Sequence, residues 1–181
     1  MNVSMKRKKN ISRRQFLKKA AGVTAGAMAF PYIVPSSALG KAGGVAPSNR
    51  IVMGAIGTGL QGVSDLRGFL GIDEVQVVAV CDVDKAHREQ AKQIVDQAYG
   101  NKDCTAYNDF REVTRRSDID AVLIATPDHW HTLPAVDAAK HGQDLFVEKP
   151  LTLTIKEGRV LSDVVRRYGR EIGRASCRGR V

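Results

Sequence analysis

The sequence predicts a doubly wound α/β fold built on a parallel sheet, and two observations carry the prediction. Short apolar runs alternate with helical stretches five times between residues 50 and 170, and a glycine-rich turn directly follows the first run. The runs are largely apolar, as in parallel strands that are buried on both faces.

The elements follow in order along the chain. We expect strands at residues 50–56, 75–81, 104–106, 121–125 and 144–148. Helices are expected at residues 60–70, 84–99, 109–116 and 132–141. Thr154 and Glu157 fit a capping box that opens a last helix. Its apolar side chains are expected to face inward, namely Leu161, Val164, Val165 and Tyr168. Such a sheet calls for a sixth strand after Arg170, but none is predicted there.

Residues 1–38 resemble a twin-arginine export signal. Arg13 and Arg14 precede a mildly apolar run at residues 20–30 and a small-residue site after which we expect cleavage, at Ala38. The run is shorter than the roughly 20 apolar residues of a spanning helix, so no stable membrane span is expected after cleavage. The alternatives are an uncleaved amphipathic anchor and a basic start that arose by chance. The resemblance implies that the twin-arginine export machinery is a partner and that the folded protein becomes periplasmic or otherwise extracytoplasmic.

The charge distribution argues against nucleic-acid binding. Nine of the 28 Lys and Arg residues lie in residues 1–41, where no Asp or Glu occurs, and the other 19 are balanced by 19 acidic residues. The formal net charge of +9 therefore belongs to the leader. Residues 39–49 are a predicted linker, and residues 42–181 carry no basic stripe interleaved with aromatic residues. No nucleic-acid partner is expected.

Two cysteines of the predicted domain are expected to be packed thiols. Cys81 ends one predicted strand and Cys104 starts the next, and parallel neighbours hold these positions apart. The third, Cys177, lies in residues 171–181, which look like the in-frame translation of a common sequencing adapter and depart from it only at Gly179. We therefore expect native sequence to stop near Arg170, before a second, substrate-binding domain. A genuine basic tail is the alternative.

A glycine fingerprint follows the first predicted strand and opens the first helix. It consists of Gly57, Thr58, Gly59, Leu60, Gln61 and Gly62. Gly57 permits a tight turn, Gly59 lets the backbone approach a pyrophosphate, and Gly62 lets the helix pack closely. The free amides and dipole at the helix N-terminus favour the phosphate charge. The pattern predicts a Rossmann dinucleotide site, and a glycine-rich turn without a ligand is the alternative.

Asp82 ends the second predicted strand, 25 residues after Gly57, where it would accept hydrogen bonds from an adenosine ribose. A carboxylate at this place repels a 2′-phosphate, so NAD is favoured over NADP as the cofactor, although Lys85 and Arg88 could offset the repulsion. The alternative is a solvated aspartate that caps the next helix, although Asp84 is the more natural cap there.

The loop after the fourth predicted strand should face the same crevice. Thr126, Pro127 and His131 are assigned to the nicotinamide side of the site. His129 and His131 have a spacing that also suits a metal, but no third ligand with suitable spacing is evident, so no metal is predicted. Trp130 is either a wall of the site or ordinary packing.

Glu148, Lys149 and Pro150 close the fifth predicted strand. Beside a positively charged nicotinamide, the Lys149 ammonium would be partly desolvated and repelled, and both effects favour a neutral amine that can accept a proton. Lys149 is therefore the expected catalytic residue, and a hydrogen-bond donor to the nicotinamide ribose is the alternative. Glu148 would orient Lys149, and Pro150 would fix the turn, for which a cis peptide bond is suited.

Residues 57–62, 126–131 and 148–150, in this order, resemble the family of glucose-fructose oxidoreductase, inositol 2-dehydrogenase and rhizopine-catabolism proteins over residues 50–170. The resemblance implies an NAD(P)-dependent oxidoreductase that transfers hydride between nicotinamide and a sugar, cyclitol or related polyol, in a protein that is a homo-oligomer when intact. It also implies that the lysine matching Lys149 lies near the reacting centre.

Two alternatives to a dehydrogenase remain open. Some exported relatives use a tightly held NAD transiently to hydrolyse a glycoside, and a non-catalytic nucleotide-binding module is a third possibility. In the family, substrate groups come mainly from a second domain. The 181-residue chain alone is therefore expected to bind cofactor weakly at best and to be inactive.

Overall fold

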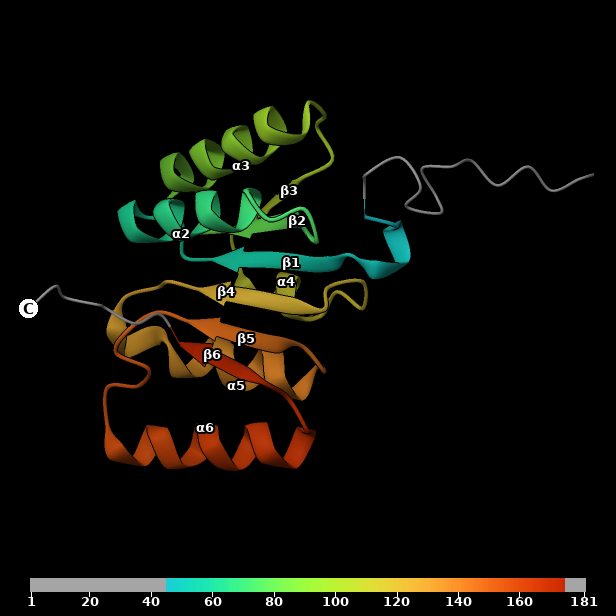
Figure 1. The fold of residues 1–181 in the computed structure, drawn as a ribbon. Coiled ribbons are helices and arrows are strands. Elements are labelled where there is room, and N and C mark those ends of the chain that lie inside the picture. Colours follow the sequence, from blue (N-terminus) through green and yellow to red (C-terminus); the bar gives the residue numbers. More distant parts are fainter. Residues whose placement is uncertain (1–44, 175–181) are drawn as a thin grey trace, which may run out of the picture.

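The computed structural model describes residues 45–174, so the predictions for the leader and for residues 175–181 lie outside the described residues. After a short 3-10 turn, η2 (Pro47–Asn49), strands and helices alternate through this range (Figure 1). The strands are β1 (Ile51–Ile56), β2 (Val75–Cys81), β3 (Thr105–Tyr107), β4 (Ala121–Ile124), β5 (Asp144–Val147) and β6 (Ile172–Arg174). The α-helices are α2 (Leu60–Leu70), α3 (Lys85–Tyr99), α4 (Phe110–Thr114), α5 (Thr132–Lys140) and α6 (Ile155–Tyr168).

The strands form one parallel sheet in the order β3-β2-β1-β4-β5-β6. The helices α2 and α3 cover one face, and α5 and α6 cover the other (Figure 1). The strand order reverses between β1 and β4, so the loops that follow these two strands diverge and leave a crevice at their carboxyl ends. The predicted doubly wound fold is confirmed.

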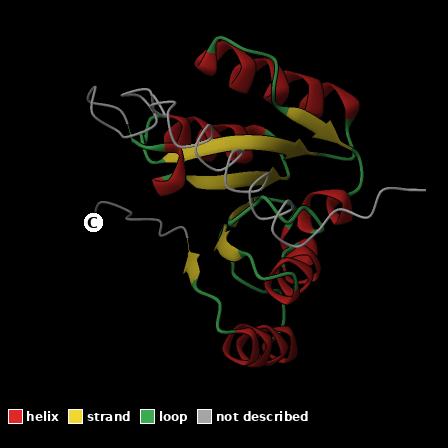
Figure 2. Cartoon of the chain, turned by 90° about the vertical axis from the view of Figure 1, so that its right-hand side faces the viewer, coloured by secondary structure: helices red, strands yellow, loops and turns green. Residues whose placement is uncertain are grey.

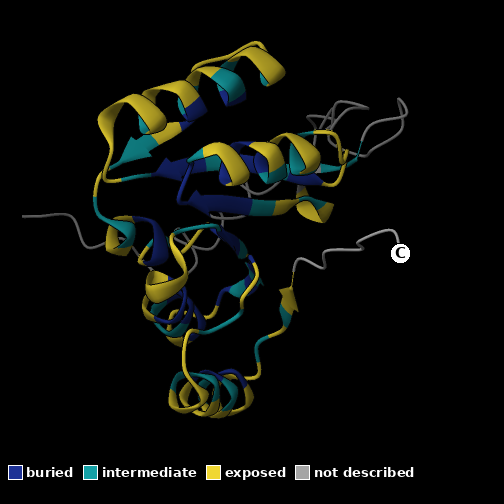
Figure 3. Cartoon of the chain, turned by 90° about the vertical axis from the view of Figure 1, so that its left-hand side faces the viewer, coloured by how far each residue is buried: buried dark blue, intermediate teal, exposed yellow. Residues whose placement is uncertain are grey.

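The strands are apolar because their side chains enter two hydrophobic cores, one on each face of the sheet. In β4, Val122 and Ile124 belong to the core under α5 and α6, whereas Leu123 belongs to the core under α2 and α3. The helices flank the sheet (Figure 2), and the exposed residues gather on their outer sides while the strands are largely buried (Figure 3). This two-sided burial explains why the strands do not show the polar and apolar alternation of a half-exposed sheet.

Several local predictions are confirmed. The Asp84 carboxylate caps α3 by accepting from the amides of Ala86 and His87, which lowers the pKa of Asp84 from its ordinary value. The capping box of Thr154 and Glu157 is complete at the start of α6. The described cysteines, Cys81 and Cys104, are buried free thiols.

The ends of most elements differ by a residue or two from the predicted ranges, and α4 is shorter than predicted. One inward prediction is wrong. Tyr168 is 43% exposed, because the last turn of α6 extends beyond the core that Leu161 and Val165 enter.

The absence of a sixth strand was also a wrong prediction. Ile172, Gly173 and Arg174 pair in parallel with Leu145, Phe146 and Val147 of β5. A three-residue run with a central glycine has no strand pattern of its own, and the open edge of β5 supplies the pairing. The adapter origin of residues 171–181 stays a prediction, because backbone pairing does not depend on which side chains are present. Within residues 45–174, no helix combines the length and apolar character that crossing a membrane requires.

Candidate functional site

A pocket of about 770 Å³ opens where β1, β2 and β4 end. It lies at the reversal of strand order, the place where open α/β sheets bind their ligands. Of the residues predicted for the site, those that line the pocket are Gly57, Gly59, Leu60, Gln61, Asp82, Thr126 and Pro127. The other predicted site residues are not part of the pocket lining and are Thr58, Gly62, His131, Glu148, Lys149 and Pro150.

The three fingerprint glycines differ in what surrounds them. Gly57 has a φ of +84°, and a Cβ there would lie 2.5 Å from the Thr126 amide nitrogen. A Cβ on Gly62 would overlap the Gly57 carbonyl oxygen. At Gly59, by contrast, a Cβ would meet nothing within 4 Å. Gly57 and Gly62 therefore serve the turn and the packing of α2, and the open surface at Gly59 can be approached by a ligand.

Gly59 also begins α2 without a side-chain cap, so the first amides of the helix stay available to a ligand. Helix N-termini of this kind attract anions through these amides and the helix dipole. Leu60, the first helical residue, is 98% exposed. This end of the pocket thus fits a diphosphate with an adjoining apolar surface.

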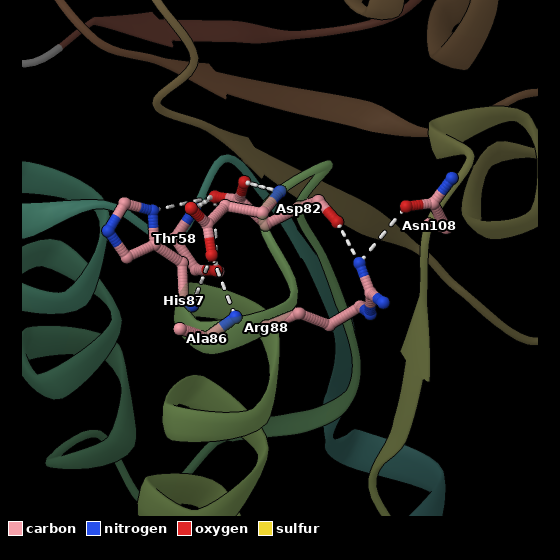
Figure 4. A network of polar contacts seen from close by, with 7 residues as sticks. Thr58, Asp82, Ala86, His87, Arg88 and Asn108 are labelled. Atoms are coloured by element: carbon pink, nitrogen blue, oxygen red, sulfur yellow. Dashed lines mark hydrogen bonds and ion pairs between the residues drawn. The ribbon is translucent and has the colours of Figure 1, made fainter.

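Asp82 joins the end of β2 to the fingerprint turn (Figure 4). Its Oδ2 accepts from the Thr58 amide at 2.7 Å and from the Thr58 hydroxyl at 3.3 Å, and its Oδ1 accepts from the Asp84 amide at 2.9 Å. Its side chain is 12% exposed. Asp82 therefore holds the turn in place and still presents carboxylate surface to the pocket.

Glu148 joins the end of β5 to α2. Its Oε1 accepts from the Gln61 amide group at 3.2 Å, and its Oε2 accepts from the Lys149 backbone amide at 2.8 Å. The same Gln61 group donates to Asp65 at 2.9 Å. Burial raises the pKa of Asp65, Gln61 partly counters this shift, and the nearby negative charge of Glu148 raises the pKa further. Glu148 thus contacts the backbone of Lys149, and its role in orienting the Lys149 side chain stays a prediction.

Lys149 itself is exposed, so the described residues do not supply the desolvation that the sequence suggested. The peptide bond between Lys149 and Pro150 is cis, as the sequence allowed. Lys149 follows β5, the strand beside β4, so its backbone lies at the same edge of the sheet as the pocket.

His131 is buried, with 1% of its surface exposed, between two loops of the site. Its Nε2 lies 2.7 Å from the Thr126 carbonyl oxygen and its Nδ1 lies 2.6 Å from the Pro150 carbonyl oxygen. The exposed neighbours His129 and Trp130 line the pocket instead. Within residues 45–174, no three His, Cys, Asp or Glu side chains gather as a metal site would require.

Two further observations bear on whether a dinucleotide fits. The Thr126 hydroxyl oxygen is buried and has no hydrogen-bond partner among the described residues, so a ligand in the pocket could satisfy it. Cys81 also lines the pocket, but burial raises the pKa of its thiol to about 12, with a smaller contribution from the charge of Asp82. The site therefore offers hydrogen-bonding groups and no reactive thiolate.

The chain matches the model of the GFO/IDH/MocA family, described as an oxidoreductase family with an NAD-binding Rossmann fold, over residues 51–174. The chain belongs to this family. The predicted family and the Rossmann fold are confirmed.

Among curated relatives, the chain is 37% identical over 172 residues to "Glycosyl hydrolase family 109 protein 1" of Shewanella sp. (strain MR-4), covering 87% of this chain and 38% of the relative. An "Alpha-N-acetylgalactosaminidase" of Shewanella oneidensis is 36% identical with the same coverage. The chain thus spans about two fifths of the length of these relatives.

Solved structures share the fold. A myo-inositol 2-dehydrogenase from Lactobacillus plantarum is 26% identical with a TM-score of 0.62, covering 70% of this chain and 36% of that one. A scyllo-inositol dehydrogenase from Lactobacillus casei, with bound NAD(H) and scyllo-inositol, is 23% identical with a TM-score of 0.62 and the same coverage. This second likeness supports the fold alone.

The residues that sequence reasoning missed at the pocket or beside it include Phe110, Arg111 and Asp65. Phe110 and Arg111 line the pocket at the start of α4, with the Arg111 guanidinium 4.9 Å from the Phe110 ring centre. Asp65 contacts the Gln61 and Glu148 side chains behind it. The four-residue spacing of Gln61 and Asp65 on a predicted helix was a usable signal for that pair, whereas nothing local marked Phe110 or Arg111.

Proposed function

We propose that this chain is the cofactor-holding part of an enzyme that uses NAD to oxidise a sugar or related polyol by hydride transfer. The observation that carries the proposal is the convergence of the fingerprint turn, Asp82 and the Thr126 loop on one pocket. The free amides of α2 would hold the diphosphate and Asp82 would accept from the adenosine ribose.

The preference for NAD over NADP rests on Asp82 and on how its basic neighbours are occupied. Arg88 donates to the Asp82 carbonyl oxygen at 2.5 Å and to Asn108 at 3.1 Å, and Lys85 pairs with Glu89 at 3.6 Å (Figure 4 shows Arg88). Both cations therefore already have partners, which weakens their attraction for a 2′-phosphate. The Asp82 carboxylate would repel a 2′-phosphate.

Cofactor binding can be measured with the single tryptophan of the chain. Trp130 lines the pocket and is 44% exposed, so bound NADH should quench its emission and accept energy from it. We expect a lower Kd for NADH than for NADPH. Asp82→Asn keeps an acceptor for Thr58 and removes the charge. It should therefore lower the ratio of the Kd for NADPH to the Kd for NADH by about tenfold. Asp73→Asn, an exposed control on the loop before β2, should leave this ratio unchanged. Equal Kd values for NADH and NADPH in the unaltered chain would refute the assignment of NAD as the cofactor.

In the proposed mechanism, bound NAD would supply the acceptor for a hydride from a sugar carbon. Lys149 Nζ accepts the proton from the hydroxyl on that carbon. Glu148, through its contact with the Lys149 amide, fixes the backbone from which the lysine reaches the substrate. The hydroxyl of Thr126 would donate to the ligand on the nicotinamide side.

The curated relatives favour a glycosidase as the net outcome. Proteins named for glycosyl hydrolase family 109 and for α-N-acetylgalactosaminidase are 36–37% identical to this chain. In such an enzyme the oxidised sugar would lose its glycosidic substituent as an alcohol, together with a proton from the neighbouring carbon. It would then add water across the resulting double bond and recover the hydride, so NAD would not be consumed. A dehydrogenase, the second candidate, would instead accumulate NADH, and the NAD-binding oxidoreductase family supports that outcome.

The decisive assay supplies 4-nitrophenyl N-acetyl-α-galactosaminide to the full-length protein encoded at the source locus and follows nitrophenol and NADH together. Nitrophenol without NADH supports the glycosidase. NADH formed in proportion to sugar supports the dehydrogenase. Lys149→Ala should abolish either activity, whereas Lys156→Ala, an exposed lysine on α6, should retain it. If Lys149→Ala kept full activity, the protein would be a binding module or would use another base.

We also propose that residues 1–38 direct export by the twin-arginine route and that residues 171–181 are not native. Arg13→Lys together with Arg14→Lys should leave the protein in the cytoplasm, as fractionation against a periplasmic marker would measure. Resequencing the locus across residues 168–181 tests the tail. A genome that encodes residues 171–181 followed by a stop would refute the adapter origin.

A further inference from the structure

The two loops nearest the proposed reaction are joined by one buried ring. His131 stands between η3 (Asp128–Trp130) and α5, and its two ring nitrogens face carbonyl oxygens on opposite sides. One oxygen belongs to Thr126, in the loop after β4, and the other to Pro150, in the loop after β5. Both contacts have hydrogen-bond length, at 2.7 and 2.6 Å, and the ring is 1% exposed.

The ring can donate to both carbonyl oxygens only when each of its nitrogens carries a hydrogen, as in the imidazolium form, because a neutral imidazole has a single N–H donor. The imidazole nitrogens project from opposite edges of a rigid plane, whereas the donors of Asn or Gln share one nitrogen. A carboxamide at this position could therefore reach one carbonyl and would leave the other without its partner. A buried carbonyl without a partner is unfavourable, so the loop that carries it should loosen.

We propose that His131 is a positioning residue that clamps the Thr126 loop to the Lys149–Pro150 turn and so sets the distance between cofactor and base. This differs from the direct cofactor contact expected from the sequence, because His131 is buried and does not line the pocket. The clamp itself is a property of the described chain, and its effect on catalysis rests on the proposed function.

The position of the clamp explains why it should affect turnover more than affinity. The fingerprint turn and Asp82, which hold the diphosphate and ribose ends, are joined to each other without His131. Lys149, in contrast, immediately precedes the clamped carbonyl of Pro150. Releasing the clamp should therefore move the base relative to the nicotinamide while most cofactor contacts remain.

The first test needs neither cofactor nor substrate. In the 181-residue chain, His131→Ala should speed backbone hydrogen exchange in peptides covering residues 125–131 and 148–153 by at least about tenfold, because the contacts of the ring with both loops are lost. Added imidazole should fill the vacated site and restore slow exchange. His131→Gln, which stays closer in size and is the second variant should the alanine form not fold, should loosen one of the two loops. His141→Ala, at the end of α5, is the control and should leave both loops within about twofold of the unaltered chain.

Unchanged exchange of both loops in folded His131→Gln and His131→Ala would overturn the clamp, and so would failure of imidazole to restore a folded His131→Ala chain. The second test uses the full-length protein. His131→Ala should lower kcat by about tenfold or more with a small change in the KM for substrate, and imidazole should recover kcat. If His131→Ala lowered kcat and cofactor affinity equally and imidazole restored neither, His131 would instead bind the cofactor directly. If the unaltered protein turns over no sugar, the proposed function fails while the exchange experiment still decides the clamp.

Discussion

Replacing Gly62 by alanine should destabilise the fold, because α2 passes the fingerprint turn too closely to admit a methyl group. The added Cβ would overlap the Gly57 carbonyl oxygen and would lie 3.0 Å from the Gly57 carbonyl carbon and 3.3 Å from the Ala125 Cβ. Gly57 has a positive φ and is itself confined against the Thr126 amide, so the turn has little freedom to move away. Overpacking of this kind costs about 1–3 kcal/mol.

Gly68, in the same helix, provides the matched control. A Cβ at Gly68 would meet nothing within 4 Å, so Gly68→Ala should stabilise the chain by about 0.5–1 kcal/mol through helix propensity alone. Gly62→Ala makes the same kind of backbone change in α2. The difference between the two variants therefore isolates the steric term, which we expect at about 1–3 kcal/mol.

Urea unfolding followed by far-UV circular dichroism measures both variants against the unaltered chain. Gly62→Ala should unfold at a lower urea concentration and Gly68→Ala at a higher one, with similar m-values. If Gly62→Ala were as stable as Gly68→Ala, the close approach of α2 to Gly57 would be wrong, and with it the geometry of the pocket. Gly59→Ala should keep the stability and lose NADH binding, because its Cβ would occupy only the open surface meant for the ligand.

Three further predictions test other parts of the fold. Asp65→Asn should raise the free energy of unfolding at about pH 7 by about 0.5–1.5 kcal/mol, since its amide can donate to Glu148. Burial and the Glu148 charge raise the pKa of Asp65, so above pH 3.8 the folded chain keeps a proton on Asp65 that the unfolded chain loses. The free energy of unfolding of the unaltered chain should therefore fall as the pH rises above 3.8. Below pH 3.8, urea unfolding should show no advantage for Asp65→Asn. Cys81 and Cys104 should resist iodoacetamide at about pH 8, as peptide mass mapping would show, because burial raises the pKa of these thiols to about 12 and about 11. The unfolded chain releases these protons first, so stability should fall as pH rises above 9.0. Thr154→Ala should cost about 1 kcal/mol in urea unfolding by removing the 3.2 Å bond from the Glu157 amide, and Thr154→Ser should restore it.

The features that the sequence predicted well are local ones. Gly57 needs a positive φ because of the turn it makes, and Thr154 and Glu157 stand three residues apart in a pattern that forms a box wherever a helix begins. The alternation of strands and helices is read from such short segments, and the right-handed crossover rule then leaves few possible sheets.

The features that the sequence did not predict are set at long range. Gln61 contacts Glu148 across 87 positions of sequence, and nothing near either residue indicates the pair. His131 has the same spacing from His129 whether it is a ligand or a buried clamp, and only the docking of α5 against the loop after β5 decides between these roles. Likewise, β6 forms because β5 has an open edge, a property of the assembled sheet.

These long-range contacts also show which groups of the site the described residues hold in place and which they do not. Asp82 ties the end of β2 to the turn after β1, Glu148 ties the end of β5 to α2, and His131 ties the end of β4 to the end of β5. Polar groups held in this way need little reorganisation when a ligand binds. Lys149 is the exception, since its backbone is held and its side chain is exposed. If Lys149 is the base, as proposed, the desolvation for proton transfer would come from the bound cofactor and substrate and from groups outside residues 45–174. On this argument the 181-residue chain should bind NADH measurably without turnover. Gly59→Ala should remove that binding, whereas in the full-length protein Lys149→Ala should remove turnover and leave NADH binding.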